Sequence, residues 1–308
     1  MLKKKDDKPL TPNPLLSEEL FDYLNEIIES SGAECKEEIS NIINSTMGLS
    51  IDAVRKRVKM TPRLKAKKLM YRAIHLPENK GRQLAEKALA IYPDCVDAFI
   101  YYGDICEEFE DAEIWYRRAV QAGERDIGAE RFEEEAGNFW GVNVTRPYMR
   151  ARALYASTLV YQDKIDEAIV EYQDMLRLNP ADNQGIRFEL VPLLIIKRRY
   201  KEYLRVYEQF EDEVTFGWLY TYFLYLFIKF GAVKKTQDVL RKAISYNPYI
   251  IEYLITDDDI PENEKDFYAF GDETEAYNYL DSCLDIWINN PKALKFLYDF
   301  WIKYKEQN

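Results

Sequence analysis

A group of arginines close together in the sequence is the first candidate for chemistry in this chain. Arg146, Arg150 and Arg152 surround Tyr148, and Arg187 follows further along beside two amides; both groups begin a predicted helix. Guanidinium groups hold carboxylates or phosphates through paired hydrogen bonds, and amide side chains can hold a peptide backbone. The alternative is that the arginines pair with the acidic stretch at 131–135 and fix a loop. The polar rim predicted from this pattern consists of Arg146, Arg152, Asn183, Gln184 and Arg187.

A second candidate is a run of basic residues in a chain that is acidic as a whole. No Asp or Glu occurs between Val54 and Leu76, whereas the whole chain has a formal net charge of −12. Such a run could dock an acidic partner, or the acidic C-terminal half of a second copy, which makes a homodimer one option. RNA contact is a weaker interpretation because aromatic residues are nearly absent there, and solvated helix faces are the alternative. The basic patch consists of Arg55, Lys56, Arg57, Lys59, Arg63, Lys65, Lys67 and Lys68.

Residues suited to catalysis or metal binding are scarce. The chain has one histidine, His75, which falls in a predicted turn without an evident partner for a catalytic dyad or triad. The four cysteines are scattered, so we expect neither a zinc site nor a disulfide framework, and free thiols suit a reducing compartment. Asp257–Asp259 lack the alternating acids and the glycine of a calcium loop. We therefore expect no metal, no cofactor and no enzymatic activity; a cryptic enzyme that uses paired carboxylates is the alternative.

The elements that would position these residues are paired helices. Apolar residues at helical spacing fill Tyr148–Tyr161 and Ile165–Leu178, separated by a short polar break in which Asp163 could cap the second helix. Pro180 ends that helix, and the resulting hairpin of about 34 residues has the length of a tetratricopeptide unit. The same pattern recurs in the two following units, where equivalent positions are Tyr172, Tyr207 and Leu240.

A single hairpin of this kind cannot bury both of its faces, so copies should stack side by side. We predict an all-α fold, a tetratricopeptide-like α-solenoid in which antiparallel helix pairs form a right-handed superhelix. The predicted divisions are a disordered lead-in at 1–14, an N-terminal helical cap at 15–60 and the solenoid at 61–308. Irregular insertions are expected at 122–144 and 249–271.

Composition limits the compartment and the classes of partner. Hydrophobic residues make up 47% of the chain, which is enough for a substantial core. The excess of acidic residues argues against nucleic acid and against anionic membranes as main partners. The charged N-terminus contains no apolar signal-peptide core, and no apolar run is long enough to cross a bilayer. We expect a cytoplasmic protein.

Several segments outside the regular repeats resemble one known family. They are AEIWYRRAVQAGE (112–124), FWG and TRPYMRA (139–151), LRLNPADNQGIR (176–187), NPYIIEYL (247–254) and FGDETEA (270–276). Together they resemble the soluble tetratricopeptide proteins related to the suppressor of tumorigenicity seven family, over roughly residues 80–300. The first 60 residues show no such match, and the membrane segments of the animal members are missing here. The resemblance implies a stack of helical repeats with a scaffold or binding role, and it brings no catalytic residues.

In tetratricopeptide stacks the first helix of each unit lines an inner, concave face that receives peptides or helices. The leading hypothesis is a non-enzymatic adaptor or scaffold that binds a protein or peptide there. A regulator that senses a small anionic ligand at the arginine rim is the alternative. Many of the rings could instead be core, since a shift of one residue exchanges inner for buried positions, and the segments at 122–144 or 249–271 could fill the groove. The residues aligned with the groove are Arg150, Ser157, Tyr161, Phe188, Trp218, Thr221, Tyr225 and Lys229.

Overall fold

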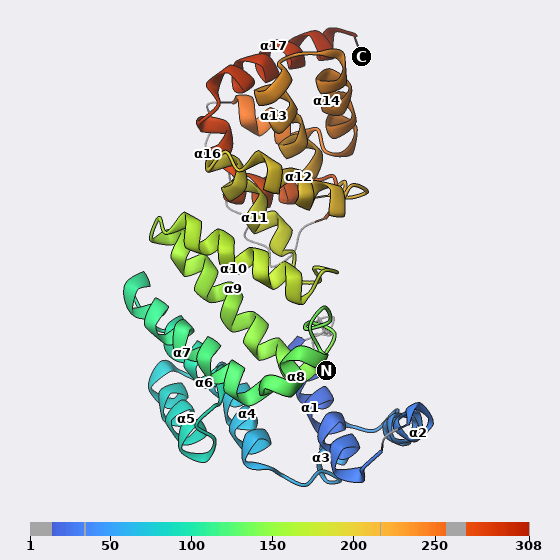
Figure 1. Cartoon of the computed structure of the whole chain (residues 1–308), viewed down its shortest axis with the longest axis vertical. Helices are drawn as coiled ribbons and strands as arrows, with labels where there is room; N and C mark the ends of the chain where they lie inside the picture. Colours follow the sequence, from blue (N-terminus) through green and yellow to red (C-terminus); the bar gives the residue numbers. More distant parts are fainter. Residues whose placement is uncertain (1–13, 34, 216, 257–268, 308) are drawn as a thin grey trace, which may run out of the picture. The chain divides into compact units, whose positions relative to one another are not determined.

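The computed structural model is built from helices. It describes residues 14–33, 35–215, 217–256 and 269–307, and within these ranges the chain forms α-helices α1 to α17, one 3-10 helix (η1) and no strand (Figure 1). Successive helices pack against each other in neighbouring pairs. The predicted all-α class is therefore confirmed.

By their mutual contacts the helices divide into two compact units, Met1–Asn183 and Gln184–Asn308. The boundary lies inside the segment that was predicted as one solenoid, 61–308. Within the described ranges, no helix is at once long and apolar enough to pass through a lipid bilayer.

Three helices precede the repeated pairs. Tyr23 of the first is fully buried and packs with Val54 and Leu64, which belong to later helices. The second is mostly exposed. The predicted disordered lead-in lies outside the described residues, except for Pro14, which begins the first helix. These helices are α1 (Pro14–Ser31), α2 (Lys36–Thr46) and α3 (Ile51–Arg55).

Three helical hairpins complete the first unit, and each joins its two helices through a short turn, which makes them antiparallel. The first hairpin begins where the hydroxyl of Thr61 accepts a hydrogen bond from the Leu64 amide at 3.3 Å. The helices of the second approach so closely that a Cβ on Gly103 would lie 2.4 Å from the Tyr116 ring. The hairpins are α4–α5 (Pro62–Ala73, Glu78–Ile91), α6–α7 (Val96–Asp104, Phe109–Ile127) and α9–α10 (Arg146–Tyr161, Ile165–Leu178).

The predicted insertion at 122–144 begins too early. Ala122, Gly123 and Ile127 are buried and continue the apolar stripe of α7, which ends only where Gly128 adopts φ +75°. Two short elements follow before α9, namely α8 (Ala129–Glu134) and η1 (Asn143–Thr145).

The loop between α8 and η1 is bonded to the end of α10. The amides of Gly137 and Phe139 donate to the Leu178 carbonyl at 3.0 and 3.1 Å. The Phe139 ring is fully buried and meets the ring of Tyr148 of α9 edge-on. The loop thus supplies donors to a carbonyl that the last turn of α10 leaves without an intrahelical partner.

The turn between α9 and α10 corrects one detail of the sequence analysis. Asp163 takes φ +57°, and Lys164 occupies the N-cap position of α10 without a side-chain hydrogen bond. The expectation that Asp163 caps α10 is therefore wrong. Asp163 instead provides the left-handed residue that reverses the chain, a conformation that Asp tolerates better than most residues.

The second unit contains two hairpins and three further helices. Within it, α16 contacts α11, α15 and α17, and its side chains also reach α13. The Tyr279 hydroxyl of α16 lies 3.0 Å from the Thr221 hydroxyl of α13, and Trp287 of α16 stacks on Phe223 of α13. The helices are α11 (Ile186–Ile196), α12 (Tyr200–Gln209), α13 (Trp218–Phe230), α14 (Lys234–Tyr246), α15 (Tyr249–Ile255), α16 (Glu273–Ile288) and α17 (Pro291–Gln307).

A buried asparagine fixes the start of α16. Asn247 Nδ2 donates to the Asp272 carbonyl at 3.0 Å and to Glu275 Oε2 at 2.8 Å. Asp272 caps α16 by accepting from the amides of Thr274 and Glu275. Within the predicted insertion at 249–271, α15 is helical, while Asp257–Asp259 lie outside the described residues.

Candidate functional site

Asp22 of α1 is the centre of a buried polar network in the first unit. Its carboxylate accepts hydrogen bonds from Lys67 Nζ (2.7 Å), the Tyr71 hydroxyl (2.6 Å) and Asn143 Nδ2 (2.8 Å). Asp22 and Lys67 are both buried and form an ion pair. A charge removed from water needs donors around it, and Asp22 has three.

Glu18, one helical turn before Asp22, binds α9. Arg150 Nη1 donates to both carboxylate oxygens of Glu18, at 2.6 and 2.8 Å, and Nη2 donates to Asp97 of α6 at 2.9 Å. Burial would raise the pKa of Asp97, but Arg150, Lys67 and Arg63 more than offset this and lower it. One guanidinium therefore joins α1, α6 and α9 through carboxylates, of which Asp97 is held ionised.

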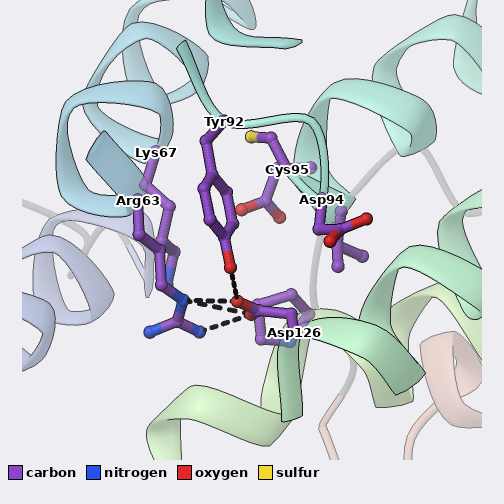
Figure 2. Close-up of a pocket in the computed structure, with 9 residues that line it drawn as sticks. Arg63, Lys67, Tyr92, Asp94, Cys95 and Asp126 are labelled. Atoms are coloured by element: carbon purple, nitrogen blue, oxygen red, sulfur yellow. Dashed lines mark hydrogen bonds and ion pairs between the residues drawn. The ribbon is translucent and has the colours of Figure 1, made fainter. Parts of the chain in front are cut away.

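A further ion pair, between Arg63 and Asp126, lines a cavity together with Lys67 and Asp97 (Figure 2). Arg63 of α4 holds Asp126 of α7 through two nitrogens, with distances from 2.7 to 3.0 Å. The Tyr92 hydroxyl also donates to Asp126. Burial and the Asp126 carboxylate raise the pKa of the Tyr92 phenol, so it remains a donor at neutral pH.

We call the side chains that the hairpins contribute to this network the inner polar face. Its charged groups are the cations Arg63, Lys67 and Arg150 and the carboxylates Asp97 and Asp126, so the net charge is +1. The nearby Asp94 is not counted because it pairs with Arg125. Glu18 and Asp22 of α1 change that net charge to −1. The face is therefore complementary to an acidic segment. The inner polar face consists of Arg63, Lys67, Tyr71, Tyr92, Asp97, Asp126 and Arg150.

Two small cavities border the inner polar face, and each has room for little more than one water molecule. They could not enclose a metabolite. The first is lined mainly by Arg63, Lys67, Tyr92, Cys95, Asp97 and Asp126. The second runs between α1 and α4 and is lined mainly by Asp22, Asn25, Glu26, Glu29, Thr61 and Lys67.

Apolar contacts hold α1 along one narrow side. Among the side chains of α1 that the structure describes, Tyr23 belongs to the buried cluster with Val54 and Leu64, and Leu20, Leu24 and Ile27 are partly buried against that cluster. Phe21 is 46% exposed. The charged and polar pairs of Asp22 and Glu18 add to these apolar contacts in fixing α1 on α4 and α9.

The inner polar face offers ion pairing and hydrogen bonding, with little means for covalent chemistry. Cys95 is its neighbouring thiol, and burial, with Asp97 close by, raises the pKa of Cys95 to about 12, so the thiol stays protonated. His75 is exposed in the turn after α4, where the sequence placed it. Among the residues that the structure describes, no group of His, Cys, Asp or Glu could hold a metal ion.

Three predicted groove residues of the second unit are buried. Trp218, Thr221 and Tyr225 are each at most 5% exposed, which contradicts the expectation that they line an open groove. The physical reason is that α13 is apolar around most of its circumference, and α12 and α16 cover it on separate sides. Tyr225, for example, packs on Tyr203 of α12.

The remaining two groove candidates of that unit lie closer to solvent. Phe188 is half-buried and meets the Trp218 ring edge-on. Lys229 is exposed, and its ammonium group lies over the ring of Tyr200. They have contacts with their own unit and do not outline a groove by themselves.

In the first unit the groove candidates belong to different surroundings. Arg150 is part of the inner polar face, where Glu18 covers it. Ser157 and Tyr161 line a surface pocket with Asp104, and Tyr161 is 68% exposed and stacks on Phe109.

The predicted polar rim does not present free guanidinium groups. Each arginine has a protein partner: Arg146 the Trp140 carbonyl, Arg152 the carboxylates of Glu171 and Asp174, and Arg187 the carboxylate of Glu213. Arg152 is buried, which contradicts a place on a rim. Asn183 is exposed and ends the first unit, whereas Gln184 begins the second. The sequence also suggested the acidic stretch 131–135 as an alternative partner of these arginines, but the partners just named lie elsewhere. From that stretch, Arg131 pairs with Glu29 of α1.

The basic patch divides into an inner and an outer set. Arg63 and Lys67 turn inward to Asp126 and Asp22, so these two do not belong to a solvated patch. The others stay nearer to solvent: Arg55 pairs with Asp52, Arg57 donates to the Ser45 carbonyl, Lys56, Lys59 and Lys65 are exposed, and Lys68 is half-buried.

Sequence reasoning missed Glu18 and Asp22. A signal was present, because the two carboxylates are four residues apart and so share one face of α1. The long-range partners of that face could not be read from the spacing alone.

Comparison of the sequence with known proteins does not identify a family for this chain. No family model matches the chain, and no curated protein sequence is significantly similar to it. The resemblance to the suppressor of tumorigenicity seven family stays a prediction.

Proposed function

We propose that this chain is a non-enzymatic adaptor or scaffold, a tetratricopeptide-like α-solenoid that binds a protein or peptide on the concave side of its hairpins. In this proposal α4, α6 and α9 are the first helices of three successive repeats. Their pairing with α5, α7 and α10, and the contacts of α6 with both α4 and α9, support it. A distant kinship with the suppressor of tumorigenicity seven family belongs to the same proposal.

The observation that carries the proposal is the way α1 lies on these hairpins. A helix from outside the repeats rests on α4, where Asp22 pairs with Lys67, and reaches α9, where Glu18 pairs with Arg150. Helices that rest in a groove of other helices are a common mode of peptide recognition. The same surface therefore has the form and the charge of a binding site for a helical segment.

An anion-sensing regulator finds less support. The arginines of its proposed rim are bonded to carboxylates or to a carbonyl of the chain itself. The cavities next to the inner polar face are also too small for a metabolite.

The proposal can be tested by comparing two charge reversals on α4. The full chain is used to capture proteins from its own cells, and each protein identified by mass spectrometry is purified and titrated against Lys67→Glu and Lys65→Glu variants. Lys67 faces the inner polar face, whereas Lys65 is exposed on the same helix. We expect at least one purified partner to lose about tenfold or more in affinity for Lys67→Glu alone. Equal binding to both variants by every partner would overturn the proposed site.

A further inference from the structure

We propose that α1 is a displaceable occupant of the inner polar face, and that an acidic amphipathic helix of a partner protein takes its place. The partner helix carries two carboxylates four residues apart, as Glu18 and Asp22 are in α1. This inference rests on the proposed function and states what kind of partner that function requires.

Recognition depends on two separate cationic positions. Lys67, Tyr71 and Asn143 surround the first carboxylate, and Arg150 forms a two-pronged contact with the second. Lys67 belongs to α4 and Arg150 to α9, so a ligand must span two hairpins to reach both. Residues i and i+4 lie on one face of a helix, one turn apart, which is the arrangement α1 uses.

The charge of the face selects against other ligands. Without α1, Lys67 keeps no carboxylate in hydrogen-bond contact among the described residues, whereas Arg150 keeps Asp97. Asp97 and Asp126 would repel a phosphate backbone, and the single unit of net positive charge is small for nucleic acid. A basic peptide would place like charges against Lys67 and Arg150. An acidic helix gives Lys67 a carboxylate and lets Arg150 hold a second carboxylate beside Asp97.

The contacts of α1 are of a kind that can be exchanged. Replacing one hydrogen-bonded carboxylate by another restores the same ion pairs, and cations uncovered during the exchange regain water. On its apolar side α1 contributes the fully buried Tyr23, with Leu20, Leu24 and Ile27 partly buried against the same cluster, a pattern that another amphipathic helix can reproduce. The cavity between α1 and α4 has room for about one water molecule.

The experiment adds a helix in trans to the full chain. The probe is a fluorescein-labelled peptide of residues 14–31, and the matched control peptide carries Glu18→Gln and Asp22→Asn. Fluorescence anisotropy measures binding to the wild-type chain and to a chain that bears the same two substitutions, which weaken its own α1. Circular dichroism checks that both chains are folded.

We expect the acidic peptide to bind the substituted chain at least about tenfold more tightly than the wild-type chain. The control peptide, which keeps Glu19, Glu26 and Glu29 but lacks the two carboxylates at positions 18 and 22, should bind neither chain. Adding Lys67→Glu to the substituted chain should abolish binding of the acidic peptide, whereas adding Lys65→Glu should not. Equal affinity for the two chains, or binding that survives Lys67→Glu, would overturn the proposal.

A second measurement needs no substitution. Excess acidic peptide should speed hydrogen exchange of the α1 amides in the wild-type chain, because a displaced α1 loses protection. Unchanged exchange at peptide concentrations that saturate the substituted chain would mean that α1 is a fixed part of the fold. If the substituted chain instead dimerises and the peptide does not dissolve the dimer, the occupant is a second copy, and the partner-helix proposal fails.

The two proposals can fail separately. In one outcome the peptide binds, but no partner captured from the cell depends on Lys67. The inner polar face would then remain a receptor for a helix, and the proposed adaptor function would fail. Partners that bind equally well to Lys67→Glu, together with a peptide that does not bind, would leave an adaptor with a different docking surface.

Discussion

Helix α1 in the first unit and helix α16 in the second each contact helices of more than one hairpin, and they are held in different ways. α1 places Tyr23 in a buried cluster, with Leu20, Leu24 and Ile27 partly buried against it, and adds the ion pairs of Glu18 and Asp22. α16 buries a continuous apolar face instead, made of Ala276, Tyr279, Leu280, Cys283, Ile286 and Trp287. Water cannot replace apolar contacts of this extent, whereas one ion pair can be exchanged for another. We therefore infer that α16 is a permanent part of its unit, whereas the ion pairs of α1 suit it to the release proposed above.

The largest effect should come from α16. Trp287 is fully buried, stacks on Phe223 and donates from Nε1 to the Tyr279 hydroxyl at 2.9 Å. We expect Trp287→Ala to lower the free energy of unfolding of the second unit by about 3–5 kcal/mol, measured by urea denaturation followed by circular dichroism. Ile288→Ala is the matched control because Ile288 is 57% exposed. A cost below about 1 kcal/mol for Trp287→Ala would show that α16 is not a core helix.

The next effect concerns α1. Asp22→Ala removes the acceptor of three hydrogen bonds and leaves Lys67 without its carboxylate. We expect the α1 amides to exchange about a hundredfold faster or more, since losing one member of a buried pair costs about 3–5 kcal/mol. Exchange in α9 and α10 should change little. Glu29→Ala, at an exposed ion pair of the same helix, should leave α1 protected. Loss of structure throughout the hairpins would contradict the idea that α1 is separable.

A smaller effect should appear in acid. The folded-state pKa of Asp97 is lowered, so its stabilising contribution is complete above the unfolded value of about 4 and is lost as pH falls through the folded value. We therefore expect the amides of α1 and α6 to lose protection against hydrogen exchange below about pH 4, which hydrogen-exchange measurements at several pH values would show. In an Asp97→Asn chain this acid-dependent loss should be weaker. Protection that rises on acidification would contradict the assigned direction.

The smallest effect should come from salt. Raising the salt concentration from 0.1 M to 1 M shortens the screening length from about 10 Å to about 3 Å. We expect this change to speed exchange of the α1 amides by a few-fold, because half-buried Arg150 and Glu18 still feel the solvent. The amides of α16 should not follow, since apolar contacts are not weakened by salt. Parallel responses in the two helices would remove the distinction between them.

The helices themselves could be predicted from the sequence because the signals are local. The spacing of apolar residues placed α9 and α10. The same kind of signal was available for the extension of α7, since Ala119, Ala122 and Gly123 continue its buried stripe.

The contents of the candidate site were harder to predict because they depend on contacts between distant residues. Helical periodicity places Trp218 and Tyr225 on one face of α13, but it does not say that rings of α12 cover that face. Likewise, Arg63 and Lys67 have the composition of a basic surface and are turned inward by carboxylates on α7 and α1. Charge patterning alone cannot separate a solvated cation from one that is paired across the fold.

The pairing of Glu18 with Arg150 joins residues 132 positions apart in the chain. During synthesis from the N-terminus, α1 leaves the ribosome long before its partner on α9 has been made. The Glu18 carboxylate must therefore wait for the third hairpin, and throughout that interval it is open to any other molecule that offers a matching charge.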